Sequence, residues 1–386
     1  MNEIVATGGA QSATVLDGKV TLNIPAGALP PKTKVTAKIA ADAPAGVPAG
    51  LTPVSPVVSI ESAAAPAKPV ILRLRYDPLK ISGLDPLCCR VFREEAGGWR
   101  LVGGRVARGE NEITVELKHF SNYAVFVVRK DFTDAPGHWA AKEIGVLAAR
   151  DVISGYPDGT FRPEDRVTRA ELAALLAKFL GMKTESITNA FSDVTPDAWY
   201  AGAVAAVAEK GLMRGAHGKF RPNDTLTREE LAAVALKLVA VSEQDLALEL
   251  RDAQEVSPWA RQAVATAAAA GLMSGRGDGK FAPKAAVTRA EVAVILYRLA
   301  ERLGLYAETV TVTGKLIYST IEKPHWELTT DKETYVLLFE PADRLTSSLV
   351  RASEGKTLTV TGYLETGPNI YMRGPIIRVV SVRLVQ

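Results

Sequence analysis

The chain has 386 residues, more than one ordinary domain holds, so its length predicts two to four domains or an array of smaller units. Hydrophobic residues make up 47% and charged residues 23%, a globular composition that excludes global disorder. The 46 basic residues nearly balance the 43 acidic ones, and this net charge of +3 lacks the basic excess typical of nucleic-acid-binding proteins. The sequence contains no run of about 18 apolar residues, so we expect no transmembrane helix.

Residues 1–128 alternate apolar and polar side chains, and Pro- and Gly-containing turns interrupt the alternation about every 8–15 positions. This pattern predicts an N-terminal antiparallel β-sandwich. The two cysteines, Cys88 and Cys89, are adjacent, and neighbouring residues of a strand point to opposite faces. We therefore expect one inward and one outward side chain, with neither a disulfide bond nor a metal site.

Residues 129–304 are rich in Ala and Leu and contain an internal repeat. Its tryptophans lie 60 residues apart, a glycine follows each of them 16 residues later, and a Thr-Arg-x-Glu sequence begins seven residues after a phenylalanine. Three copies in register predict three modules of one fold. The repeated positions are Trp139, Trp199 and Trp259; Gly155, Gly215 and Gly275; Phe161, Phe220 and Phe281; and Thr168, Thr227 and Thr288.

Each copy is predicted to form a helix, a loop and a second helix. The Thr-Arg-x-Glu sequence is typical of a capping box, in which the Thr hydroxyl and the Glu carboxylate accept each other's backbone amides. An apolar stripe follows, and because such stripes must be buried, the second helices are expected to form a central all-α bundle. The stripes are Leu172, Leu175, Leu176 and Phe179; Leu231, Val234, Ala235 and Leu238; and Val292, Ile295, Leu296 and Leu299.

Residues 305–386 return to alternating patterns and offer about five strands, which suits a small OB-like β-barrel. Gly314 and Gly362 interrupt strand patterns and are predicted to form bulges. Four aromatic residues could form a ligand platform, although half-buried strand positions explain them equally well. These residues are Trp326, Tyr335, Tyr363 and Tyr371.

The repeat resembles the S-layer homology module of bacterial surface proteins, through its F-x-D sequence, its Trp, its G-Y-P-D-G-x-F-x-P loop and its T-R-A-E helix start. The resemblance divides the region into modules at 129–186, 187–246 and 247–304. It implies a pseudo-threefold unit whose intermodule grooves bind anionic secondary cell-wall polysaccharide, especially a pyruvylated terminal sugar. It also implies a non-catalytic protein of the bacterial cell surface, part of or attached to the S-layer, with self-association or contact with other S-layer proteins left open.

A surface location further implies that a signal peptide has been removed, because the first residues lack both a basic and an apolar segment. The physical chemistry of the repeated residues agrees with anion binding. A helix start offers free amides, an Arg there adds a charge-assisted donor to a carboxylate, and a Trp offers a flat face to a sugar ring. The implied ligand-binding residues are Asp134, Trp139, Gly155, Tyr156, Arg169, Asp193, Trp199, Gly215, Arg228, Asp252, Trp259, Gly275 and Arg289.

Structural roles compete with these assignments: Thr and Glu as helix caps, and Phe and Trp as core residues. The copies also differ, because Ala216 and Arg276 stand where the first copy has Tyr156, and Leu250 replaces the Phe of F-x-D. The groove expected to contain Tyr156 and Arg169 is therefore the strongest candidate. Asp158 and Asp165 lack the calcium-loop pattern and are expected in a solvated turn.

Residues 17–30, DGKVTLNIPAGALP, and the closing segment 117–126 resemble the ZU-five type of β-sandwich. Some members of that family cleave themselves at a His-Phe-Ser sequence, which is present here as His119-Phe120-Ser121. The alternative is an ordinary closing strand with Phe120 in the core, and we expect no self-cleavage. A wall-anchored enzyme stays the alternative function, but no metal-ligand or nucleophile motif is recognisable, and neither a cofactor nor a nucleic-acid partner is expected.

Overall fold

The computed structural model describes residues 2–81, 83–185, 191–239, 250–276, 278–321, 323–340, 343–365 and 374–385. The chain divides into two compact units. One unit contains residues 1–130, 304–338 and 355–386, and the other contains residues 131–303 and 339–354. The division into five domains, at 1–128, 129–186, 187–246, 247–304 and 305–386, stays a prediction.

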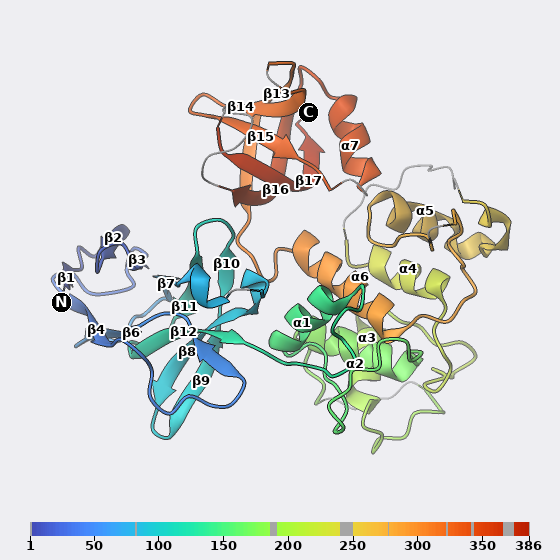
Figure 1. The fold of residues 1–386 in the computed structure, drawn as a ribbon, viewed down its shortest axis with the longest axis horizontal. Coiled ribbons are helices and arrows are strands. Elements are labelled where there is room, and N and C mark those ends of the chain that lie inside the picture. The colour runs from blue at the N-terminus through green and yellow to red at the C-terminus, as the bar shows by residue number, and fades with distance from the viewer. Residues whose placement is uncertain are drawn as a thin grey trace. The chain divides into compact units, whose positions relative to one another are not determined.

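The N-terminal region forms the expected antiparallel sandwich, with one sheet in the order β1-β4-β6-β12-β8-β9, to which β5 adds by pairing with β12 (Figure 1). The other sheet has the order β10-β11-β7-β3-β2. Alternation places Val20, Leu22 and Ile24 of β3 in the core, as the sequence predicts. The strands are β1 (Asn2–Val5), β2 (Gln11–Val15), β3 (Val20–Ile24), β4 (Lys34–Ala41), β5 (Leu51–Pro53), β6 (Val57–Ser62), β7 (Val70–Arg75), β8 (Cys89–Glu95), β9 (Gly98–Gly103), β10 (Arg105–Ala107), β11 (Glu112–Leu117) and β12 (Asn122–Val128).

The expectation of one inward and one outward cysteine is wrong. Cys88 ends the short 3-10 helix η2 (Pro86–Cys88), whereas Cys89 begins β8, and both residues are buried. The strand alternation that was expected to separate them does not extend over Cys88. Another short 3-10 helix, η1 (Pro78–Ile81), precedes them.

The helical unit contains three helix pairs joined in a cyclic order, in addition to α7 (Arg344–Arg351). The first helix of each module packs on the second helix of the module before it, so that α3 packs on α2, α5 on α4, and α1 on α6. The last of these contacts closes the cycle between the first and third modules. The helices are α1 (Ala141–Ala149), α2 (Arg169–Phe179), α3 (Ala201–Glu209), α4 (Arg228–Leu236), α5 (Arg261–Ala269) and α6 (Arg289–Arg302), with the 3-10 helices η3 (Ala253–Glu255) and η4 (Pro258–Ala260) before α5.

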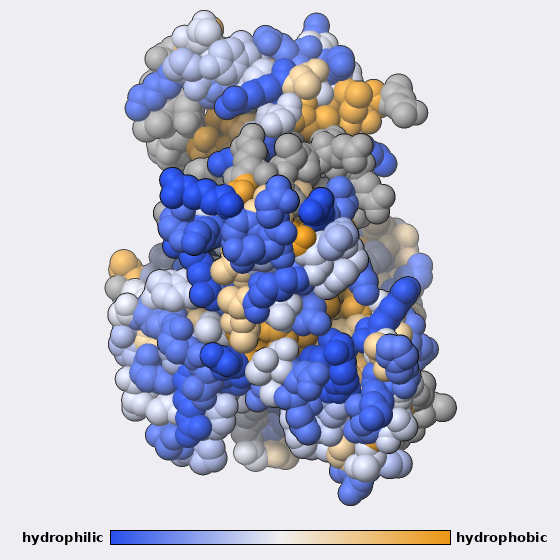
Figure 2. All heavy atoms as spheres, turned by 90° about the vertical axis from the view of Figure 1, so that its right-hand side faces the viewer, coloured by the Kyte–Doolittle hydropathy of each residue, from blue (hydrophilic) through white to orange (hydrophobic). Residues whose placement is uncertain are grey.

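The centre of this unit is a closed ring of three backbone hydrogen bonds, one per module boundary. The amide of Val167 donates to the carbonyl of Val287 at 3.1 Å, that of Val287 to Leu226 at 2.9 Å, and that of Leu226 to Val167 at 3.0 Å. The predicted stripes are buried except at Leu175 and Leu238, which are half-buried. Hydrophilic residues accordingly dominate the face drawn in Figure 2, and apolar side chains appear there only in small patches.

The C-terminal strands form a closed ring in the order β13-β14-β15-β17-β16, as expected for an OB-like barrel. Gly362 lies at a register shift in β16, which confirms the predicted bulge. Gly314 keeps its register, and a side chain there would approach the carbonyl oxygen of Thr329 to 2.6 Å, so close strand approach explains it instead. The elements are β13 (Val310–Ser319), β14 (His325–Thr329), β15 (Thr334–Leu338), β16 (Thr357–Glu365) and β17 (Ile376–Leu384), with α7 (Arg344–Arg351) between β15 and β16 in sequence.

Candidate functional site: the grooves of the helical unit

All three Thr-Arg-x-Glu sequences form the predicted capping boxes. Each Thr side chain accepts a hydrogen bond from the backbone amide of the Glu three residues later. Each Glu carboxylate in turn accepts a hydrogen bond from the Thr amide, at 2.8 to 3.0 Å in the three copies. Capping by Thr and Glu is therefore confirmed, and it fixes the helix starts at which the three arginines stand.

Each of these arginines extends into the loop of the following module. Nε of Arg228 donates to the carbonyl of Phe281 and its NH2 nitrogen to the carbonyl of Ser274, both at 2.7 Å. The other two arginines repeat this pattern at 2.8 and 2.9 Å, so that the third module's arginine reaches the first module's loop. The three arginines therefore clamp the modules together through backbone carbonyls. The additional pairs are Arg169 with Phe220 and Arg214, and Arg289 with Phe161 and Ser154.

The clamps differ in exposure and in the use of the remaining NH1 nitrogen. Arg228 and Arg169 are buried at 4% and 6% exposure, whereas Arg289 is half-buried. The NH1 nitrogen of Arg228 forms a short ion pair with Glu291, and that of Arg169 lies 3.9 Å from Glu230. Burial lowers the pKa of both buried guanidiniums, against the opposing effect of these carboxylates. The arginines predicted as ligand contacts thus have structural partners first.

The expectation that one groove contains both Tyr156 and Arg169 is wrong. Arg169 does not meet Tyr156, because it reaches the second module's loop. Two other guanidiniums lie over the Tyr156 ring. Arg162 of the same loop is 3.9 Å from the ring centroid, and Arg289 of the third module is 5.1 Å from it. The cyclic order of the modules explains the difference, since each arginine serves the next loop and the third module closes on the first.

The F-x-D aspartates hold the loops of their own modules. The two carboxylate oxygens of Asp134 accept the amides of Phe161 and Arg162, both at 2.7 Å. Burial raises the pKa of this carboxyl, but the two amide donors outweigh burial and hold the pKa below its ordinary value. Asp193 and Asp252 make the same contacts with the same pKa direction, so ligand binding by the aspartates stays a prediction.

The loop glycines are required by close packing. A side chain at Gly155 would contact the ring of Phe132 and approach the carbonyl of Thr160 to 2.6 Å. Gly215 meets Phe191 in the same way, whereas Gly275 is limited by the carbonyl of Lys280 at 2.8 Å, since its module has Leu250 in place of the Phe. The phenylalanines of the F-x-P sequences are buried, as the structural alternative predicted: Phe161, Phe220 and Phe281.

The three tryptophans are exposed, so core packing does not account for them. The exposed fractions of Trp139, Trp199 and Trp259 are 62%, 71% and 60%. Each indole stands just before its module's first helix, which packs on the second helix of another module. An exposed indole at an intermodule boundary is suited to stacking against a sugar ring.

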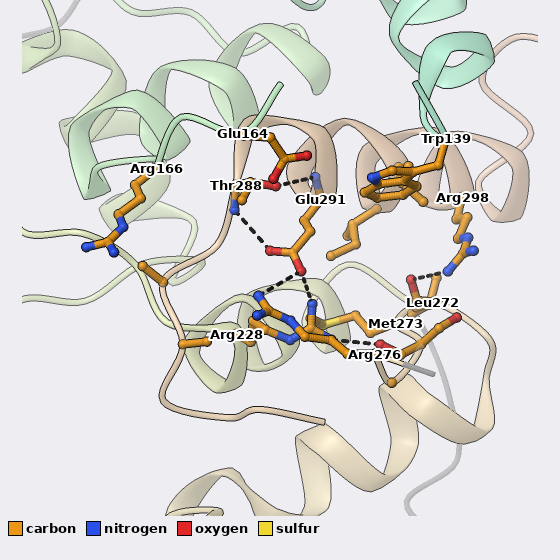
Figure 3. A pocket seen from close by; sticks show the side chains of 16 residues that line it. Trp139, Glu164, Arg166, Arg228, Leu272, Met273, Arg276, Thr288, Glu291 and Arg298 are labelled. Atoms are coloured by element: carbon orange, nitrogen blue, oxygen red, sulfur yellow. Dashed lines mark hydrogen bonds and ion pairs between the residues drawn. The ribbon is translucent and has the colours of Figure 1, made fainter. Parts of the chain in front are cut away.

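One such boundary encloses a cavity of about 910 Å3, here called the Trp139 groove (Figure 3). Its lining combines the three modules: Trp139 of the first, Arg228 of the second, and Arg276, Thr288 and Glu291 of the third. Glu291 accepts hydrogen bonds from Arg228 and from the backbone amide of Thr288, and it lies 3.5 Å from the NH2 nitrogen of Arg276. The volume lies within the range of small-ligand pockets.

Sequence reasoning did not identify several residues of this groove. Glu164 lies 2.9 Å from the ring of His138, and Arg298 donates to the carbonyl of Leu272 at 3.1 Å. Arg166 also lines the cavity. A usable signal was their spacing, since Arg166 precedes a capping Thr by two residues and Arg298 follows the capping Glu291 by seven, on the same helix face.

A second intermodule contact is specific to one boundary. Glu229, which stands where the other modules have Ala170 and Ala290, is buried and accepts from Lys284 at 2.6 Å and from the amide of Ser257 at 3.0 Å. Burial raises the pKa of Glu229, but these donors outweigh it and lower the pKa below its ordinary value.

The other sites considered from the sequence have structural partners. Asp158 accepts from the amide and hydroxyl of Thr160 and from Arg162, which lowers its pKa and matches the predicted turn. In the described part of the chain, no group of three or more His, Cys, Asp or Glu residues could hold a metal ion. No described helix is long and apolar enough to span a membrane.

The His-Phe-Ser segment lies between β11 and β12 and not within a strand. Phe120 is half-buried, so its expected place in the core is wrong. His119 is exposed, and burial together with Arg93 lowers its pKa. The carbonyl of His119 accepts a hydrogen bond from the Tyr123 hydroxyl at 2.7 Å. None of the three residues of this segment has a positive φ angle.

The barrel aromatics do not form one shared platform. Trp326 and Tyr335 are half-buried, as the alternative predicted, whereas Tyr363 is buried at 3% exposure. Trp326 pairs instead with Tyr318, at 4.8 Å between ring centroids. Tyr371 lies outside the described residues.

A family model for the S-layer homology domain matches residues 131–173, 190–232 and 249–293. An amylopullulanase of Thermoanaerobacterium thermosulfurigenes is 37% identical over 62% of this chain and 13% of its own length. Exoglucanase XynX of Acetivibrio thermocellus is 39% identical over 44% of the chain and 16% of its own, and the surface-layer 125 kDa protein of Lysinibacillus sphaericus is 30% identical over 61% and 21%. The chain thus spans about a fifth or less of the length of each of these relatives.

These matches include both surface-layer proteins and enzymes, so they do not assign an activity to this chain. Each matched segment covers the first helix of a pair, the loop and the capped start of the second helix. The chain therefore carries three S-layer homology domains, is homologous to S-layer proteins, and is a cell-surface protein anchored to the bacterial cell wall.

Proposed function

We propose that the helical unit anchors this protein by binding pyruvylated secondary cell-wall polysaccharide, and that the chain itself is non-catalytic. The observation that carries the proposal is the Trp139 groove, in which an exposed indole lies at a cavity lined by guanidinium groups. An indole face suits the apolar side of a sugar ring, and guanidinium donors suit a ketal-linked carboxylate. The groove therefore offers both chemical features of a pyruvylated sugar.

A binding assay on cell-wall sacculi tests the proposal. The full chain should sediment with native sacculi, and binding should fall strongly when the pyruvate ketals are removed from the polysaccharide by mild acid. Sacculi stripped of the whole polysaccharide serve as the control for adhesion to peptidoglycan. Equal sedimentation with native and ketal-free sacculi would contradict the proposed role of the pyruvate.

The alternative, a wall-anchored enzyme, is favoured by the enzymes among the relatives. Those enzymes extend far beyond the part that this chain matches. We therefore propose that modules of this kind anchor different cargo, and that this chain is part of the S-layer or attached to it.

A further inference from the structure

The Trp139 groove contains an arginine whose donors are already used. Arg228 donates through Nε to Phe281, through NH2 to Ser274 and through NH1 to Glu291. Only 4% of the residue is exposed. A carboxylate entering the groove would have to break one of these contacts to bind Arg228. The helix-start arginine, although repeated in all three modules, is therefore poorly placed to recognise a ligand in this groove.

Arg276 is the opposite case. It stands at the loop position occupied by Tyr156 in the first module and Ala216 in the second. Its side chain is 47% exposed, and its NH2 nitrogen lies 3.5 Å from Glu291, an oxygen that already pairs with Arg228. Its amide donates to the carbonyl of Lys280 at 2.9 Å, which holds the loop backbone, while the exposed guanidinium can donate hydrogen bonds to a ligand.

A second guanidinium faces the same cavity from the first module. Arg166 is exposed, and its side chain makes no hydrogen bond or ion pair within the described residues. Figure 3 shows it apart from the cluster of Arg228, Arg276 and Glu291. Glu164, a nearby carboxylate, is engaged by His138 at 2.9 Å. The groove therefore presents two separated positive charges that its own carboxylates do not fully neutralise.

We propose that Arg276 holds the acid group of the polysaccharide in the Trp139 groove, that Arg166 supplies a second cationic contact, and that Arg228 is a positioning residue. This inference rests on the proposed function. The sugar ring lies against the indole of Trp139, and its carboxylate meets the exposed guanidinium of Arg276. A sequence departure from the family loop thereby becomes the specificity-determining residue of this groove.

The test isolates the groove in the full-length chain. Trp199→Ala and Trp259→Ala together remove the exposed indoles at the two corresponding boundaries and leave Trp139. Calorimetric titration with purified wall polysaccharide fragments that carry pyruvate ketals then compares Arg276→Ala and Arg276→Lys in this background. Arg100→Ala, an exposed arginine of β9 in the other unit, is the control for loss of one positive charge.

Arg276→Ala should weaken binding by about tenfold or more, since a bidentate charge-assisted contact is lost. The affinity of the Arg276→Lys variant should fall between that of the unaltered arginine and that of Arg276→Ala, because lysine keeps the charge but lacks the planar guanidinium group. The temperature of helical unfolding should be unchanged in both variants. In the otherwise unaltered chain, Arg276→Ala should remove one high-affinity site from the measured stoichiometry.

Binding of Arg276→Ala equal to that of Arg100→Ala would overturn the inference, and so would loss of all binding in the double Trp variant before Arg276 is changed. Failure of the proposed function looks different. In that case the unaltered chain would bind ketal-free fragments as tightly as native ones.

Discussion

Replacing Arg228 by alanine should destabilise the helical unit far more than replacing Arg276. Arg228→Ala removes three charge-assisted contacts, to the carbonyls of Phe281 and Ser274 and to Glu291. Glu291 has only 13% of its side chain exposed, so its charge loses a partner in a place where water replaces it poorly. The change also leaves two loop carbonyls without their donor.

The magnitude follows from these contacts. Hydrogen bonds to charged groups contribute about 1.5–3 kcal/mol each, and removing one partner of a buried ion pair costs about 3–5 kcal/mol. The contributions overlap because they share one side chain, so we expect a total loss of about 3–5 kcal/mol. Arg276→Ala should lower the free energy of unfolding by less than about 1 kcal/mol, because the Arg276 side chain is 47% exposed and makes one contact at 3.5 Å.

Urea unfolding monitored by circular dichroism at the helical band is the appropriate assay, because all α-helices in the described part of the chain belong to this unit. The full chain contains two units, so the helical transition is compared between variants and not converted into one global free energy. Arg289→Ala, whose arginine is half-buried, should give an intermediate shift. Equal midpoints for Arg228→Ala and Arg276→Ala would refute the assignment of Arg228 as a clamp.

Three other changes test separate contacts. Glu229→Gln should destabilise the helical unit at neutral pH. The difference in stability from the unaltered chain should shrink as pH falls through the lowered folded-state pKa of Glu229, because the stabilisation requires the ionised carboxylate. Urea midpoints measured across acidic pH test this. Gly155→Ala should cost about 1–3 kcal/mol by overpacking against Phe132, whereas Gly145→Ala, within α1 and with open space around it, should not destabilise. A denaturing gel should show one band near 41.2 kDa, and two bands that merge in Ser121→Ala would contradict the absence of self-cleavage.

The capping boxes and apolar stripes could be predicted because they depend on residues three or four positions apart. Thr168 and Glu171 satisfy each other's amides whatever the rest of the chain does. The strand alternation of the sandwich is local in the same sense. Predictions of this kind failed at Cys88, where a 3-10 helix gives way to a strand, and at Gly314, which stays in register within β13.

The partners of the arginines could not be predicted in this way. Ser154 and Arg289 are 135 residues apart, and their contact exists only because the third module closes on the first. A repeat gives the same residues in each copy but does not say whether a side chain serves its own loop or the next. The exposure of the tryptophans depends on the same closure, since an aromatic residue at fixed spacing is equally typical of a core.

The clamp design explains how one scaffold supports grooves of different chemistry. Each arginine binds backbone carbonyls, which are present whatever side chains the loop carries. The loop position after the glycine can therefore change among Tyr156, Ala216 and Arg276 without loss of the clamp. Because the Trp139 groove takes lining residues from all three modules, a chain with fewer modules could not form it. The clamps thus stabilise the modules through contacts that do not depend on the side chain at this loop position, and we propose that recognition resides in the side chains that differ there.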